Sequence, residues 1–182
     1  NTMARFGEVL KNVILKDTDD IYNRIYVVSA YSGITNELLE HKKTGKPGIY
    51  QTFAESRDYE PAMLSLQQKL CKLNRSFKDI GLHVEKANRF ICERIAFALN
   101  ILKSMDNVLA SGYFDRTDVL LAAKELLASI GEMHSAFNTA NILQNLGYPA
   151  TFVDLSGWQD RRERTIDERI KHTFSNLNPA RT

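Results

Sequence analysis

The feature that most constrains this fold is a stripe of apolar residues recurring every three or four positions between Met63 and Leu102. This spacing places the side chains on one face of an α-helix. Gly81 interrupts the stripe, so we predict two antiparallel helices, a helical hairpin covering about residues 62–105. The stripe is typical of core packing rather than of a ligand site.

Two short segments outside the hairpin have the composition of β-strands. Residues 24–30 and 150–155 are rich in β-branched and aromatic side chains, and helix-like sequence surrounds both of them. Strands that alternate with helices favour an α/β protein with a parallel sheet. Two strands in 182 residues are few for such a sheet. Either further strands lie beyond Thr182, or the protein is mostly helical.

Helical spacing also predicts elements outside the hairpin. Further helices are expected at residues 5–15, from Thr35, at 117–130 and 133–146 on either side of Gly131, and after the capping box at 165–168. Residues 44–60 carry glycine and proline and are predicted to form a loop.

Composition excludes several classes of protein. The 24 basic and 22 acidic residues give a net charge of +2, too even for nucleic acid or an anionic membrane as the main partner. No apolar run is long enough to span a bilayer. The two cysteines are too few for a disulfide framework and are expected to be reduced, as in a cytosolic protein. The four histidines show no metal-binding spacing, so no metal site is predicted.

Two groups of polar residues are candidates for a binding site. Ser29, Ser32 and Thr35 follow the first predicted strand, where backbone N–H groups and hydroxyls suit a carboxylate or a phosphate. The alternative is an ordinary strand–turn–helix with capping hydroxyls. Glu132 directly follows Gly131 and has the charge to receive a substrate ammonium group. Its alternative role is a favourable charge near a helix start.

The two groups together resemble the aspartokinase branch of the amino-acid kinase family. Its members carry a Val-Val-Ser-Ala-x-Ser-Gly-x-Thr-Asn run, which stands here as Val27–Asn36, and later a Gly-Glu-x-x-Ser-Ala motif, which stands here as Gly131–Ala136. We call these the first and the second motif. The resemblance covers almost the whole chain. Residues 30–33 and 42–48 look like the aspartokinases associated with ectoine synthesis.

The resemblance implies a fold and an activity. The fold is the amino-terminal lobe of the amino-acid kinase fold, a parallel sheet with flanking helices and a helical hairpin insertion. The activity is phosphoryl transfer from ATP, with Mg²⁺, to the side-chain carboxylate of L-aspartate, giving 4-phospho-L-aspartate. This is the first step of aspartate-family amino-acid biosynthesis, including lysine, or of ectoine biosynthesis. A cytoplasmic homodimer is expected.

The same resemblance assigns site residues. Ser29 and Thr35 are expected to contact aspartate, and Glu132 to bind its amino group as an orienting catalytic residue. Thr2 falls in the register of the phosphate-binding start of the family. The lysine and two glycines of that start are missing before Asn1, and the later Arg-Gly-Gly-Ser-Asp run is absent.

Residues 1–182 are therefore predicted to be a partial catalytic domain, without the nucleotide-binding half and the regulatory domains. We expect these residues alone to have no kinase activity. The alternative from another class is a non-catalytic helical interaction module that uses the hairpin as its contact surface.

Overall fold

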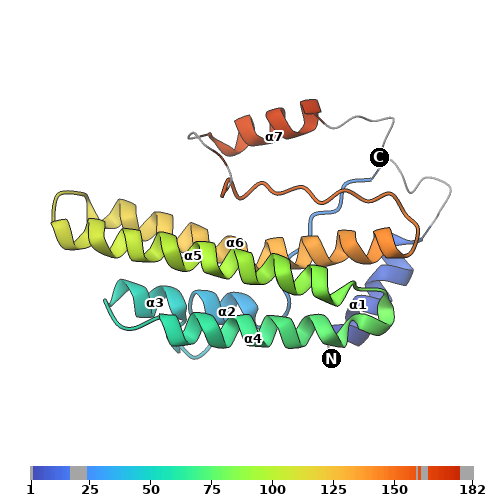
Figure 1. The fold of residues 1–182 in the computed structure, drawn as a ribbon, viewed down its shortest axis with the longest axis horizontal. Helices are drawn as coiled ribbons and strands as arrows, with labels where there is room; N and C mark the ends of the chain where they lie inside the picture. Colours follow the sequence, from blue (N-terminus) through green and yellow to red (C-terminus); the bar gives the residue numbers. More distant parts are fainter. Residues whose placement is uncertain (1, 17–23, 159, 161–163, 177–182) are drawn as a thin grey trace.

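The chain is predominantly helical (Figure 1). The computed structural model describes residues 2–16, 24–158, 160 and 164–176. The helices are α1 (Thr2–Val9), η1 (Leu10–Ile14), α2 (Ile34–Leu38), α3 (Ile49–Ala54), α4 (Glu60–Ser76), η3 (Lys78–Ile80), α5 (Val84–Ser111), α6 (Arg116–Asn145) and α7 (Ile166–Asn176).

The three longest helices form the body of the molecule. α5 packs against both α4 and α6, and each neighbouring pair runs antiparallel (Figure 1). α2 and α3 lie beside α4 and also contact α6. Although α5 and α6 are long, no helix within the described residues is long and apolar enough to cross a membrane.

The core lies where the apolar faces of these helices meet. Its side chains come from η1, α2, α3, α4, α5 and α6. Those with no exposed area include Leu38, Met63, Leu70, Ile91, Ile95 and Leu127. Burying one such side chain contributes roughly 1.5–3 kcal/mol. The apolar stripe thus forms the interface of an α4–α5 hairpin, with Gly81 at the connection in a left-handed conformation (φ 101°).

The predicted α/β fold with a parallel sheet is wrong for the described residues. Residues 24–30 and 150–155 form no regular secondary structure, and no ladder of hydrogen bonds joins either of them to a neighbour. The one β-bridge among the described residues, Glu40 to Pro47, lies elsewhere. A strand needs a partner for its backbone groups, and Val27, in the first predicted strand, is 95% exposed and therefore not covered by a neighbouring layer. The mostly helical alternative is the one observed.

Two local predictions also differ from the structure. The predicted loop at residues 44–60 contains the short helix α3 (Ile49–Ala54). The two helices expected on either side of Gly131 are one continuous helix, α6. A glycine inside a helix costs about 1 kcal/mol relative to alanine, and tertiary packing readily offsets that cost.

Candidate functional site

The first motif forms a tight turn before α2. The backbone N–H of Ile34 donates to the carbonyl oxygen of Tyr31 at 3.0 Å. Gly33 has φ 85°, a left-handed conformation in which a side chain would be strained. Ser29 precedes the turn and Thr35 follows it, and both are exposed.

This turn lies directly against the second motif. A Cβ atom added to Gly131 would stand 2.8 Å from the Cβ of Ala30 and 3.1 Å from Cγ2 of Ile34. The absence of a side chain at Gly131 therefore lets α6 and the turn approach each other closely. The two motifs, far apart in the sequence, meet at this contact, and Glu132 is the exposed residue next to it.

The structure corrects the local surroundings predicted for Glu132 and leaves the role of Thr2 untested. Glu132 lies in the middle of α6 and not at a helix start, so the charge of a helix end does not act on it. An open hollow of about 520 Å³ between α2 and α4 includes Gly33 and Asn36 of the first motif, but its lining does not include Ser29, Thr35 or Glu132. Thr2 begins α1, and its side chain lies outside the described part of the structure.

A buried polar network lies beneath the contact between the motifs. Oδ1 of Asn74, on α4, stands 2.7 Å from Nε2 of His134 and accepts a hydrogen bond from Nδ2 of Asn138 at 2.8 Å. Nδ2 of Asn74 donates to Oδ1 of Asn88, on α5, at 2.9 Å. The network therefore joins three helices through neutral side chains.

His134 is held neutral inside this network. Burial lowers the pKa of its imidazole to about 4. Its ring lies 5.5 Å from the ring of Tyr31 in an edge-to-face arrangement. Tyr31 is itself buried against Phe6 and Phe77, and burial raises the pKa of its phenol above the ordinary range.

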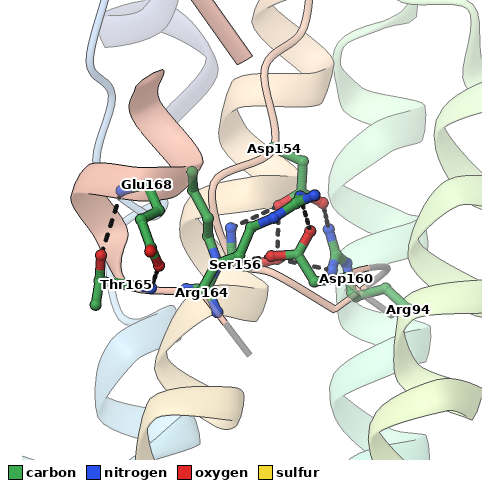
Figure 2. Close-up of polar contacts among 8 residues, drawn as sticks. Arg94, Asp154, Ser156, Asp160, Arg164, Thr165 and Glu168 are labelled. Atoms are coloured by element: carbon green, nitrogen blue, oxygen red, sulfur yellow. Dashed lines mark hydrogen bonds and ion pairs between the residues drawn. The ribbon is translucent and has the colours of Figure 1, made fainter. Parts of the chain in front are cut away.

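A second polar cluster holds the segment that follows α6 (Figure 2). The guanidinium of Arg94, on α5, pairs with the carboxylate of Asp154 and donates to the hydroxyl of Ser156 at 3.1 Å. Its Cζ lies 4.0 Å from the centre of the Trp158 ring. Burial lowers the pKa of Arg94, and the charge of Asp154 opposes this effect. Because Arg94 is 1% exposed, it anchors this segment and does not present a charge to a ligand.

The same segment is tied to the start of α7. Asp160 accepts from Arg164 at 3.2 Å and from Arg169 at 2.9 Å, and the hydrogen bond from Arg169 lowers the pKa of its carboxyl group. The predicted capping box is present: the N–H of Thr165 donates to Glu168 at 2.8 Å, and the N–H of Glu168 donates to the Thr165 hydroxyl at 3.3 Å (Figure 2).

Sequence reasoning did not identify Arg94 or the asparagines of the network. A signal was present for Arg94, which lies within the apolar stripe between Ile91 and Ile95 and so faces the core. Asn74 likewise lies one helical turn after Leu70 on the buried face of α4. Polar residues at core positions of a helix indicate a buried partner.

In sequence, the chain is similar to an aspartokinase, as the two motifs predict. Along 99% of its length the chain is 38% identical to aspartate kinase Ask_Ect of Stutzerimonas stutzeri (strain A1501), over 185 aligned residues. The chain spans 39% of the length of that protein. The predicted resemblance is thereby confirmed. No protein-family model matches the chain, and no solved structure matches it.

Proposed function

We propose that this chain provides the aspartate-binding part of an aspartate kinase. The reaction is transfer of the terminal phosphoryl group of ATP to the side-chain carboxylate of L-aspartate, giving 4-phospho-L-aspartate. The observation that carries the proposal is the 38% identity with an aspartate kinase along 99% of the chain. The close contact of the two motifs at Gly131 supports it.

The residue types suit the chemistry of this reaction. The nucleophile is a carboxylate with an ordinary pKa of about 3.9, so it is ionised at neutral pH and needs no general base. Alignment and neutralisation of charge then supply most of the catalysis. In the proposed site, the hydroxyls of Ser29 and Thr35 donate to the substrate, and the carboxylate of Glu132 receives its ammonium group.

ATP and Mg²⁺ enter the proposal as co-substrate and cofactor. Among the described residues, no group of three or more His, Cys, Asp or Glu side chains is placed to hold a metal ion. Mg²⁺ in such enzymes is bound by one or two carboxylates together with substrate phosphates. The steps proposed for this chain are therefore the binding and orientation of aspartate.

The proposal also includes the pathway, the cellular location and the oligomeric state. The reaction is the first step of ectoine or aspartate-family amino-acid biosynthesis, and residues 42–48 favour the ectoine type. We expect a cytoplasmic homodimer. The identity with an aspartate kinase favours the enzyme over a non-catalytic helical interaction module.

The proposal predicts that Glu132→Ala weakens aspartate binding in the full-length protein. The KM for aspartate should rise about tenfold or more, because a hydrogen bond to a charged group contributes roughly 1.5–3 kcal/mol. The free energy of unfolding should change by less than about 0.5 kcal/mol, because the side chain is exposed. A hydroxamate assay of the acyl phosphate measures the first effect, and urea unfolding measures the second.

The matched control is Glu125→Ala, which removes another exposed carboxylate from α6. This variant should retain the turnover and aspartate KM of the wild type. Unchanged kcat and KM in Glu132→Ala would remove Glu132 from the site.

A further inference from the structure

The two motifs are joined by one side chain from each, at the positions that the family patterns leave open. Tyr31 occupies one of the two open positions of the first motif, and His134 occupies one of the two open positions of the second. We propose that these two residues are positioning residues, which hold the turn of the first motif against the helix that carries Glu132. The inference rests on the proposed function and adds to it the residues that set the geometry of the aspartate site.

The Tyr31 side chain fixes the place of the turn. Its carbonyl accepts the hydrogen bond that closes the turn at Ile34, so the ring and the turn move together. The ring is buried between Phe6, Phe77 (5.2 Å between ring centres) and His134. Contacts from three sides leave the ring one position in a close-packed core.

The His134 side chain fixes the orientation of α6. Oδ1 of Asn74 is an acceptor only, so Nε2 of His134 carries the proton and donates to it at 2.7 Å. Nδ2 of Asn138, one helical turn further on, donates to the same oxygen. These two hydrogen bonds attach the inner face of α6 to α4 and resist rotation of α6 about its axis.

The orientation of α6 determines where Glu132 points. Successive residues of an α-helix are separated by about 100° around the axis, so Glu132 and His134 lie about 200° apart. With His134 fully buried, Glu132 faces outward beside the turn, and it is exposed. A shift of about 1 Å in such a group is enough to lower catalysis strongly.

The competing explanation is that the hydrogen bonds of His134, Asn74 and Asn138 only stabilise the fold. The kinetic constants for aspartate and ATP distinguish this structural role from the proposed positioning role. The test uses the full-length enzyme with His134→Leu, which keeps volume but removes the donor to Asn74. We expect the aspartate KM to rise about tenfold while the ATP KM stays within about twofold. His134→Gln retains an N–H donor at the end of its side chain and should restore the aspartate KM.

Asn88→Ala is the matched control. It breaks the same network at the α5 end, where Asn88 accepts from Asn74, away from the turn. It should lower the melting temperature as His134→Leu does, yet leave the aspartate KM unchanged. If both variants leave the aspartate KM unchanged, or if both raise the aspartate and ATP constants equally, the network is structural only and the inference is overturned.

Variants of Tyr31 provide an independent test. Its hydroxyl oxygen makes no hydrogen bond of normal geometry among the described residues, although the side chains of Asn138 and Ser135 lie near enough to lower its pKa slightly against the larger effect of burial. Tyr31→Phe should therefore retain the wild-type aspartate KM, whereas Tyr31→Leu, which removes the ring contacts, should raise it as His134→Leu does. A normal KM in Tyr31→Leu contradicts the inference.

Hydrogen exchange distinguishes failure of this inference from failure of the proposed function. The amide of Ile34 reports closure of the turn without any substrate. Faster exchange at Ile34 in His134→Leu, but not in Asn88→Ala, is expected whether or not the enzyme phosphorylates aspartate. A full-length wild-type enzyme that does not phosphorylate aspartate would refute the proposed function, whereas unchanged exchange in His134→Leu would refute the positioning role.

Discussion

Arg94 is deeply buried, and three neighbouring groups compensate for the burial of its charge. Asp154 supplies the opposite charge, Ser156 supplies a hydrogen-bond acceptor, and the Trp158 ring covers the guanidinium plane. Removing one partner of a buried pair leaves the other charge uncompensated, and this is more destabilising than the pair itself is stabilising. The segment after α6 thus depends on Asp154 to stay attached to α5.

Asp154→Ala should lower the free energy of unfolding by about 3 kcal/mol, because Arg94 then remains buried without its counter-charge. Urea unfolding followed by circular dichroism measures the change. The control is Lys103→Ala, which breaks the exposed ion pair with Glu60 and should lower stability by less than about 1 kcal/mol. Equal effects in the two variants would contradict the anchoring role of Arg94.

At this scale the motifs point to surface residues, and the buried polar residues were not predicted. Ser29, Thr35 and Glu132 were chosen because they belong to the two sequence motifs, and they remain predictions for the aspartate site. His134 is one of the four histidines to which the sequence assigned no functional role, and it is buried. Its hydrogen-bonding role was not predictable because its partner Asn74 comes from another helix. The spacing of residues along one helix does not show which residues of other helices it contacts.

Among the elements, α6 can contact the turn of the first motif closely because position 131 is a glycine. Gly131 faces Ala30 and Ile34 across a gap that a Cβ atom would overfill. The glycine that sequence reasoning assigned to a helix break therefore serves packing between elements, and the helix continues through it.

Gly131→Ala should destabilise the protein by about 1–3 kcal/mol, because the new methyl group forces the turn away from α6. The control is Gly7→Ala in α1, where an added Cβ meets no atom within 4 Å. That change should stabilise the protein by about 0.5–1 kcal/mol through helix propensity alone. Thermal unfolding of the two variants should thus give shifts of opposite sign, and shifts of the same sign would contradict the packing argument.

The helices with a clear apolar period were predictable, whereas the prediction of a sheet was wrong for the described residues. Helical spacing is a local property, so the stripe from Met63 to Leu102 identifies α4 and α5 without further information. A strand is stabilised by its neighbours, and the composition of residues 24–30 and 150–155 says nothing about whether partners are present. α3 was missed because its six residues are too few to show a period against the surrounding glycine and proline.

For the molecule as a whole, His134 makes stability depend on pH. Its pKa is about 4 in the folded chain and about 6.5 when unfolded, so the unfolded chain binds more protons between these values. Stability is therefore greatest above about pH 6.5 and falls as the pH is lowered toward 4. The loss approaches roughly 3 kcal/mol. Tyr31, the titratable group that faces His134, stays neutral throughout this window.

Urea unfolding at several pH values between 4 and 7.5 measures this loss, and His134→Gln is the control because it cannot take up the proton. The variant should show a flatter dependence of stability on pH than the wild type over this window. Parallel curves for the two proteins would show that another group is responsible.

Trp158 is the only tryptophan in the chain, and it lies on the Arg94 guanidinium with its ring edge-to-face to Phe97 at 4.9 Å. The molecule therefore contains one intrinsic fluorophore, placed where the segment after α6 meets α5. Its emission reports the local polarity at that single place, so detachment of the segment can be followed optically in the unlabelled protein, separately from the melting of the helices.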